Sequence, residues 1–155
     1  MARALVLALG NRLSGADAFG PAVLDQLGHA GMPVGIDAIE AGTDLLRHID
    51  RFADYDAIVL VDAVVGSDDR RIEIIPERTF ETWDARSRSA HELSAVGCVT
   101  LFRALQPRTG DTAKPVITLI ALMIPEEDFG YRPTPAEVDE AAAAVYLTCL
   151  ASAGV

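Results

Sequence analysis

The chain has 155 residues, of which 50% are hydrophobic and 23% are charged, and this composition excludes a disordered chain because it supplies ample apolar surface for a core. Lys and Arg number 13 and Asp and Glu number 23, so the formal net charge is −10. Phosphate backbones and anionic lipid surfaces would repel such a chain, which argues against nucleic acid or a membrane as a partner. We predict a single domain over residues 1–155 that acts as a monomer.

The cysteines and the apolar runs predict a cytoplasmic protein. Cys98 and Cys149 lie in apolar segments without C-x-x-C spacing, which is typical of small buried residues in a reducing compartment. The apolar run that opens the chain is interrupted by Gly10, Asn11 and Arg12 before it reaches the length of a signal-peptide core. No run approaches the ~18 apolar residues that a membrane span needs.

Five strands are predicted from the apolar pattern. Residues 4–9, 57–61 and 116–122 are almost continuously apolar, as in strands buried on both faces of a parallel sheet. Residues 34–38 and 71–74 alternate between apolar and polar, which is typical of strands with one exposed face near a sheet edge.

Four helices are predicted between and after these strands. Apolar residues recur at helical spacing from Phe19 to Leu27, from Leu45 to Ile49, from Leu93 to Leu105 and from Val138 to Cys149. The last helix has the clearest start, because Thr134 and Glu137 form a capping-box pattern around Pro135. The alternation predicts a three-layer α/β fold with a mostly parallel, twisted sheet of about five strands flanked by helices.

The polar stretch from Pro76 to Ala90 is predicted to be a long loop. It carries Trp83 and the cations Arg86 and Arg88, so it is a candidate for contact with an acidic partner, the alternative being a solvated loop.

Three polar residues follow the predicted strands and are candidates for catalysis and for metal binding. Asp17 follows the loop after the first strand, Asp62 follows the apolar run that ends at Val61, and His91 precedes the third helix. Ligands gather at the carboxyl ends of strands in open α/β sheets, and two carboxylates with one imidazole suit a divalent metal such as zinc or nickel. Two of these residues have structural alternatives: Asp17 could be an acid that stabilises a helix start, and His91 could be a solvated loop residue. Asp62 is harder to explain without a function, because desolvation of a carboxylate at the end of a buried strand costs free energy unless the group has a partner.

Other site types fit the sequence poorly. The glycine-rich stretch from Gly10 to Gly20 lacks both G-x-G-x-x-G and the Walker pattern, so no nucleotide cofactor is expected. Asn11 is a natural residue for a positive-φ turn, and Gly42 with Thr43 makes a similar turn after the second strand. Cys98 is expected in the core and His48 on a helix surface. Asp62 could also be the phospho-acceptor of a receiver domain, but the sequence lacks the paired acids after the first strand and the Lys after the last strand that such domains have.

The order of these motifs resembles the hydrogenase maturation proteases, which trim the C-terminal extension from the large subunit of nickel-iron hydrogenases. The resemblance rests on Gly10-Asn11-x-Leu13-x-x-x-Asp17-x-x-Gly20, Gly42-Thr43, Asp62-Ala63, His91-x-Leu93 and Ile124-Pro125. It covers nearly the whole chain, from Leu5 to the last helix.

The resemblance implies a single α/β domain and an endopeptidase of a nickel-loaded large-subunit precursor. It further implies that Asp17, Asp62 and His91 contact the nickel carried by the precursor, or another divalent metal in the isolated protein. If the metal activates water, one carboxylate holds the ion and the other is available as a base.

The chain departs from the family pattern at three positions. Ala16 stands where many members carry an additional acid, Ala41 stands where the second turn usually has Gly, and Ser94 replaces a Gly. These departures keep an alternative open, a non-catalytic chaperone that binds metal or the precursor.

Overall fold

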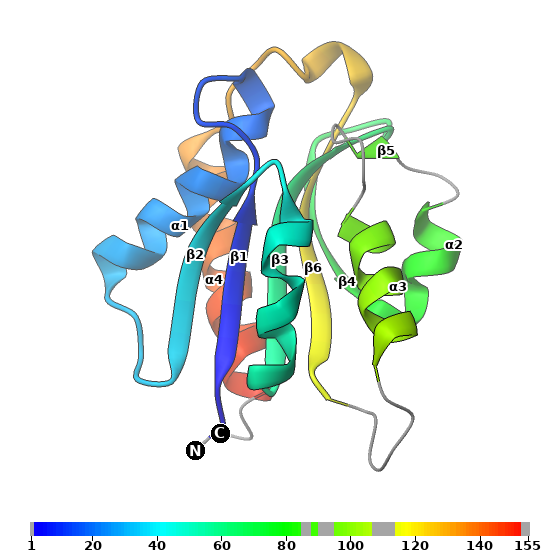
Figure 1. Ribbon diagram of the computed structural model, residues 1–155. Helices are drawn as coiled ribbons and strands as arrows, with labels where there is room; N and C mark the ends of the chain where they lie inside the picture. The colour runs from blue at the N-terminus through cyan, green and yellow to red at the C-terminus, as the bar shows by residue number, and fades with distance from the viewer. Residues whose placement is uncertain (1, 85–87, 90–94, 107–113, 153–155) are drawn as a thin grey trace.

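A computed structural model describes residues 2–84, 88–89, 95–106 and 114–152. Its centre is a sheet in the order β2-β1-β3-β6-β4, built from β1 (Ala4–Leu9), β2 (Ile36–Gly42), β3 (Ala57–Val65), β6 (Val116–Ile124) and β4 (Arg71–Pro76) (Figure 1). Neighbours in this order pair in parallel except β4, which runs antiparallel to β6. The predicted α/β fold with its mostly parallel sheet is confirmed, and the two alternating strands, β2 and β4, are the edges.

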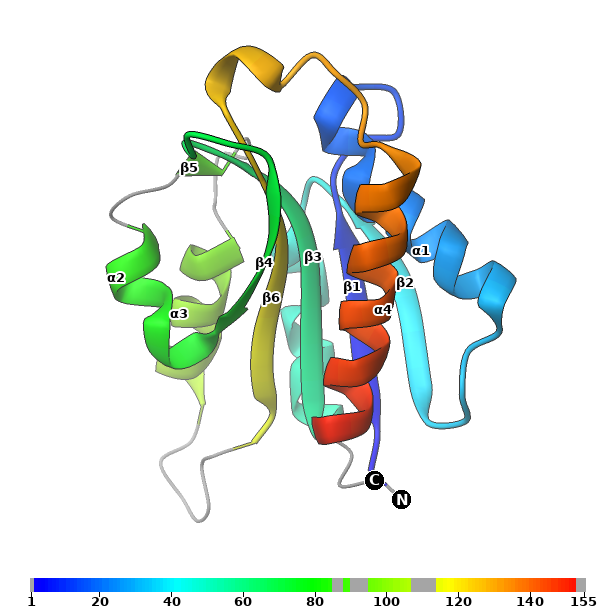
Figure 2. The same cartoon turned by 180° about the vertical axis from the view of Figure 1, so that it is seen from behind.

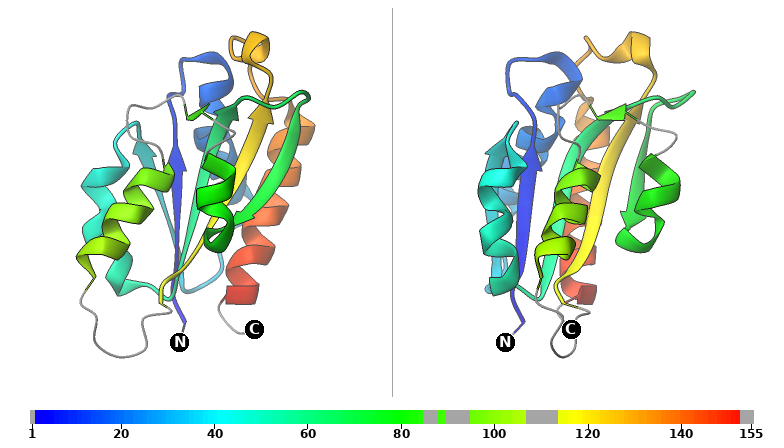
Figure 3. Two further views of the ribbon diagram at one scale, coloured as in Figure 1. Left: turned by 90° about the vertical axis from the view of Figure 1, so that its right-hand side faces the viewer. Right: turned by 45° about the vertical axis from the view of Figure 1, so that its right-hand side comes forward.

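Helices cover both faces of the sheet (Figures 1 and 2). The helices α1 (Phe19–Ala30) and α4 (Pro135–Ser152) pack together on one face. The other face carries the 3-10 helix η2 (Leu45–Asp54), α2 (Phe80–Asp84) and α3 (Ala95–Leu105), and Figure 3 shows these layers from the side. Among the described residues, none of the helices combines the length and the apolarity that a membrane crossing requires.

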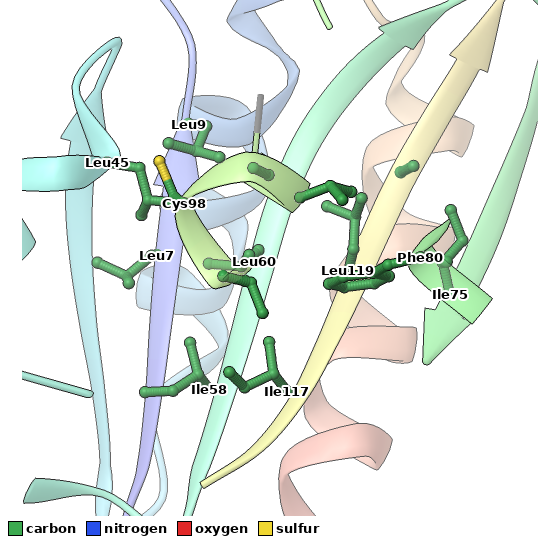
Figure 4. Close-up of a cluster of buried hydrophobic side chains, with 14 of the residues drawn as sticks. Leu7, Leu9, Leu45, Ile58, Leu60, Ile75, Phe80, Cys98, Ile117 and Leu119 are labelled. Carbon is green, nitrogen blue, oxygen red and sulfur yellow. The ribbon is translucent and has the colours of Figure 1, made fainter. Parts of the chain in front are cut away.

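The sheet separates two hydrophobic clusters because consecutive side chains of a strand point to opposite faces. On the η2 and α3 face, Phe52 and Phe102 pack with ring centroids 5.1 Å apart. Cys98 of α3 lies over the sheet near Leu7 and Leu9 (Figure 4). On the opposite face, the other side chains of β1, β3 and β6 pack against α1 and α4.

Both cysteines are buried free thiols, as the sequence predicts. Burial raises the pKa of Cys149 to about 11, and it also raises the pKa of Cys98. Both side chains therefore stay protonated at neutral pH and pack as small apolar groups.

The capping box of α4 is confirmed. The Thr134 amide donates to Oε1 of Glu137 at 2.8 Å, and the Glu137 amide donates to Oγ1 of Thr134 at 3.2 Å. These bonds satisfy backbone donors that the first turn of a helix otherwise leaves without partners.

The stretch from Pro76 to Ala90 is more structured than predicted. It contains the 3-10 helix η3 (Glu77–Thr79), the helix α2 and the two-residue strand β5 (Arg88–Ser89). Phe80, with 4% of its surface exposed, packs in the η2 and α3 cluster and so anchors this otherwise polar segment. Arg86 lies outside the described residues.

Candidate functional site

Asp62 lies inside β3, which corrects the prediction that the strand ends at Val61. The strand continues because β6 pairs with it as far as Val65, which stands opposite Ile124. On its other side β3 pairs with β1 only up to Val61, opposite Ala8, so Asp62 is the first residue of β3 beyond β1. Its side chain is 1% exposed, and its Oδ1 accepts a hydrogen bond from the Ala63 amide at 2.9 Å.

Asp17 is carried by a compact loop that leaves the end of β1. It lies in the 3-10 helix η1 (Gly15–Ala18), which contacts β3, and 6% of its surface is exposed. The Asn11 amide donates to the Asp17 carbonyl oxygen at 3.0 Å, and the Asp17 amide donates to the Ser14 carbonyl oxygen at 2.9 Å. These bonds fold the loop back on itself around Asp17, whose carboxylate is buried.

The positive-φ residues of this loop are Gly10 and Gly15 and not, as predicted, Asn11. Gly10 has φ +124°, and a Cβ there would lie 2.0 Å from the Asp17 carbonyl oxygen. Asn11 instead uses its side chain, whose Oδ1 accepts a hydrogen bond from the Leu13 amide at 2.9 Å. Gly10 is therefore required by the close approach of Asp17 to the end of β1.

The first turn of α1 brings this loop against β3. A Cβ on Gly20 would lie 2.1 Å from the Leu9 carbonyl oxygen and 3.0 Å from that of Val61, the residue before Asp62. The connection after β1 runs through α1 on one face, and the connection before β3 runs through η2 on the other. In α/β proteins, such a change of face between neighbouring strands leaves a crevice at their carboxyl ends in which ligands bind. Asp62 and the helix η1 that carries Asp17 lie at this end of β1 and β3.

His91 lies outside the described residues. The described residue closest to it in the sequence is Ser89 of β5. Ser89 pairs with Val64, which lies two residues beyond Asp62 in β3. Across the described part of the chain, no three His, Cys, Asp or Glu side chains are grouped closely enough to hold a metal ion. Carboxylate oxygens, such as those of the buried Asp17 and Asp62, are the kind of donor that divalent cations prefer.

Arg12 holds the Asp17 loop in place, a role that the sequence analysis missed. Its Nη1 and Nη2 donate to the carboxylate of Asp25 on α1 at 2.7 and 2.9 Å. Its Nε and Nη2 donate to the carboxylate of Glu40 on β2 at 2.8 and 2.9 Å. The hydrogen bonds from Arg12 lower the pKa of Asp25 below its ordinary value. No local signal marks this residue, because its partners are 13 and 28 residues away.

A second loop, after β6, borders the same edge of the sheet (Figure 2). The Ala16 amide donates to the Phe129 carbonyl oxygen at 3.0 Å, and Nη1 of Arg132 donates to the Arg12 carbonyl oxygen at 3.3 Å. Two large side chains on these loops face solvent, Leu13 with 91% and Tyr131 with 69% of the surface exposed. The buried carboxylates are therefore bordered by apolar groups suited to contact with another polypeptide.

Solved structures of hydrogenase maturation proteases match almost the whole chain. The [NiFe] hydrogenase maturation protease HybD from Thermococcus kodakarensis is 28% identical, with a TM-score of 0.72, over 95% of this chain and 99% of its own. The chain is therefore similar to hydrogenase maturation proteases in both sequence and fold. The hydrogenase 2 maturation peptidase from Thaumarchaeota archaeon SCGC_AB-539-E09 is 27% identical, with a TM-score of 0.53, over 98% of both chains.

The fold is also that of a bacterial member of the family. The hydrogenase maturating endopeptidase HybD from E. coli superposes with a TM-score of 0.74, at 23% identity, over 98% of this chain and 94% of its own. Neither a family model nor a curated protein matches the sequence. The resemblance identified from the order of the motifs is thus confirmed by the structures.

Two departures from the maturation protease pattern have a structural explanation. Ala16 is fully buried and packs with Phe19 and Val61 in the cluster between the sheet and α1. Ala41 is buried on the other face, in the cluster that contains Leu45. Both positions contribute to the core of this protein, where an acid in place of Ala16 would be desolvated. Ser94, the third departure, lies outside the described residues.

Proposed function

We propose that the protein is an endopeptidase that removes the C-terminal extension of a nickel-loaded large-subunit precursor of nickel-iron hydrogenase. The observation that carries the proposal is the position of Asp17 and Asp62, both buried, at the crevice between β1 and β3. The 28% identity to a [NiFe] hydrogenase maturation protease over nearly full length supports the assignment of the substrate.

Asp17, Asp62 and His91 are the residues proposed to contact the nickel of the precursor. Carboxylate oxygens and an imidazole nitrogen suit this ion, and in the isolated protein another divalent metal is the alternative. A divalent ion at this position would supply Lewis-acid activation of water. Whichever carboxylate does not hold the ion is available to accept the proton from the attacking water.

The loops around the carboxylates are proposed to hold the precursor. Leu13 and Tyr131 expose apolar surface on two neighbouring loops, and Arg12 fixes the loop that presents Leu13. Burial of these side chains against the precursor would exclude water from the crevice and position the peptide bond near the carboxylates.

The alternative is a non-catalytic chaperone that binds metal or the precursor, and Ala16 is the observation that favours it. Where many members carry an additional acid, this chain has a methyl group with no exposed surface. If that acid is needed for hydrolysis, the protein binds the precursor without cutting it.

A cleavage assay distinguishes the two functions. Purified protein is incubated with the nickel-loaded precursor and, in parallel, with the metal-free precursor, and the products are weighed by mass spectrometry. The endopeptidase removes a C-terminal peptide from the nickel-loaded form alone. Stable binding of the nickel-loaded precursor without loss of mass would instead support the chaperone.

Isosteric variants test the two carboxylates. Asp17→Asn and Asp62→Asn are expected to reduce cleavage by at least about a hundredfold while the protein stays folded, because neither change opens a cavity. Asp139→Asn removes one exposed carboxylate on α4 and is the matched control for the change in charge. Full cleavage by Asp62→Asn would remove the basis of the proposed site.

A further inference from the structure

A polar cavity lies next to the candidate site, at the carboxyl end of β2. Its volume is about 630 Å³, and it is lined by Glu40, Ala41, Gly42, Arg47, His48 and Arg51. The Gly10 amide donates to the Gly42 carbonyl oxygen at 2.8 Å, so the wall of the cavity is joined directly to the loop that carries Asp17. Gly42 has φ +66°, and this turn leads the chain from β2 into η2, which supplies the cationic side of the cavity.

Two arginines in this cavity are available to a ligand. Arg47 and Arg51 are exposed and lie four residues apart on η2. Within the described residues, neither side chain forms an ion pair or a hydrogen bond, whereas five other arginines each bind a carboxylate: Arg3, Arg12, Arg70, Arg71 and Arg103. His48, which the sequence predicts to lie on a helix surface, is half-buried and lines the cavity together with the two arginines.

The acids close to the cavity do not neutralise these cations. Glu40 is the one carboxylate among the described residues of the lining, and it already accepts hydrogen bonds from Nε and Nη2 of Arg12. Asp50 of η2 lines a different cavity, between η2 and α3. The cavity therefore carries excess positive charge on a chain whose net charge is −10.

We propose that this cavity is a carboxylate-binding subsite that takes an acidic segment of a polypeptide. Guanidinium groups bind carboxylates through two parallel hydrogen bonds, and two of them on one wall can hold neighbouring acidic groups. The volume lies within the usual range for ligand sites. Glu40 in the same wall disfavours a phosphate dianion more strongly than a carboxylate, which carries one charge.

The direct connection to the Asp17 loop suggests where that polypeptide comes from. A chain lying across Gly10 and Gly42 reaches both the arginines and the crevice between β1 and β3. If the proposed function holds, on which this step rests, the acidic segment belongs to the hydrogenase precursor. The negative surface elsewhere does not prevent binding, because charges more than ~8 Å apart are largely screened at physiological salt.

Peptide binding tests the subsite without any requirement for cleavage. The probe is a fluorescein-labelled decapeptide of alternating Gly and Glu with an amidated C-terminus, and its anisotropy is followed at physiological salt. The same peptide with Gln in place of Glu is the uncharged control. A Gln peptide with a free C-terminus shows whether the cavity takes a terminal carboxylate instead of side-chain carboxylates.

We expect the Glu peptide to bind and the amidated Gln peptide not to bind. Binding of the Gln peptide with a free C-terminus but not of the Glu peptide would overturn the proposal of an acidic segment. The double variant Arg47→Ala with Arg51→Ala should weaken binding of the Glu peptide at least about tenfold, as expected for the loss of charge-assisted hydrogen bonds. Arg47→Gln alone, a milder change, should weaken it less. Arg78→Ala removes an exposed arginine of η3 outside the cavity and should leave it unchanged. Equal binding of the charged and uncharged peptides, or an equal loss in Arg78→Ala, would overturn the proposal.

The cleavage assay separates this inference from the proposed function. The double variant should raise KM for the nickel-loaded precursor and leave kcat unchanged, because the arginines hold the substrate away from the reacting groups. Binding of the acidic peptide by a protein that cleaves no precursor would sustain the subsite and refute the endopeptidase. Cleavage by a protein that binds none of the carboxylate peptides would refute the subsite alone.

Discussion

The guanidinium of Arg12 donates to the carboxylate of Glu40 through Nε and Nη2, at 2.8 and 2.9 Å, and so joins the Asp17 loop to β2. The same guanidinium holds Asp25 of α1. All three side chains are partly exposed to solvent, so the pairs add little to the stability of the fold. Their effect is positional, because they fix the entry of the loop that places one of the two buried carboxylates.

Replacement of Arg12 by Ala is expected to loosen this loop without unfolding the protein. The backbone amides of Asn11 and Asp17 should exchange faster with deuterium, and precursor cleavage should fall about tenfold or more. Arg3→Ala is the matched control, since Arg3 is an exposed arginine paired with Asp37 at the other end of β1. An equal effect of both substitutions on cleavage would contradict a specific role for Arg12.

Gly20 and Gly28 of the same helix are expected to respond to alanine in opposite directions. At Gly20 the added Cβ would meet the Leu9 carbonyl oxygen at 2.1 Å, so Gly20→Ala should lower the free energy of unfolding by about 3 kcal/mol. At Gly28 nothing lies within 4 Å, and Gly28→Ala should raise it by about 0.5–1 kcal/mol. Urea denaturation measures both values. Equal destabilisation by the two substitutions would show that helix α1 does not press on β1 as described.

Glu137 is expected to make the stability of the protein depend on acidic pH. Hydrogen bonds from Arg70, at 2.8 and 3.0 Å, are the main cause of a lowered Glu137 pKa, and the Thr134 amide adds to it. A lowered pKa stabilises the folded state at pH above the ordinary value of 4.5, and this stabilisation is lost as pH falls through the folded-state pKa.

Glu137→Gln should therefore lower the free energy of unfolding by about 1–2 kcal/mol at neutral pH, and the difference from wild type should shrink in acid. Chemical denaturation at a series of pH values measures this. Glu140→Gln, at an exposed position of the same helix, is the control and should show no such trend. A difference that is constant across the series would rule out the charge of Glu137 as its source.

Leu13 is expected to contact the precursor. It is 91% exposed on the loop that carries Asp17, and Leu13→Ser should raise KM several-fold with little change in kcat, because an apolar contact outside the reacting groups is lost. Leu147→Ser is the control, since Leu147 is 64% exposed but lies on α4. Both variants should melt at the wild-type temperature. A higher KM for Leu147→Ser than for Leu13→Ser would place the docking surface elsewhere.

The elements with local signals could be predicted from the sequence alone. β1 spans the predicted residues 4–9, and α4 begins at Pro135 because Thr134 and Glu137 exchange hydrogen bonds within one turn. The edge positions of β2 and β4 agree with the prediction from their alternating side chains. These patterns are readable because the interacting groups are neighbours in the chain.

The assembly of the candidate site could not be predicted from the sequence, because it depends on contacts between distant segments in the tertiary structure. Asp62 lies within β3 and not after it because β6, more than fifty residues later, continues the pairing. Asp17 reaches the same crevice because β1 and β3 are neighbours and Gly20 lets α1 approach both. The partners of Arg12 and the cation-lined cavity beside Gly42 likewise join distant segments. Such contacts leave no periodic trace in the sequence, because they depend on the order of strands in space and on carboxylates brought within hydrogen-bond distance of guanidinium groups only after folding.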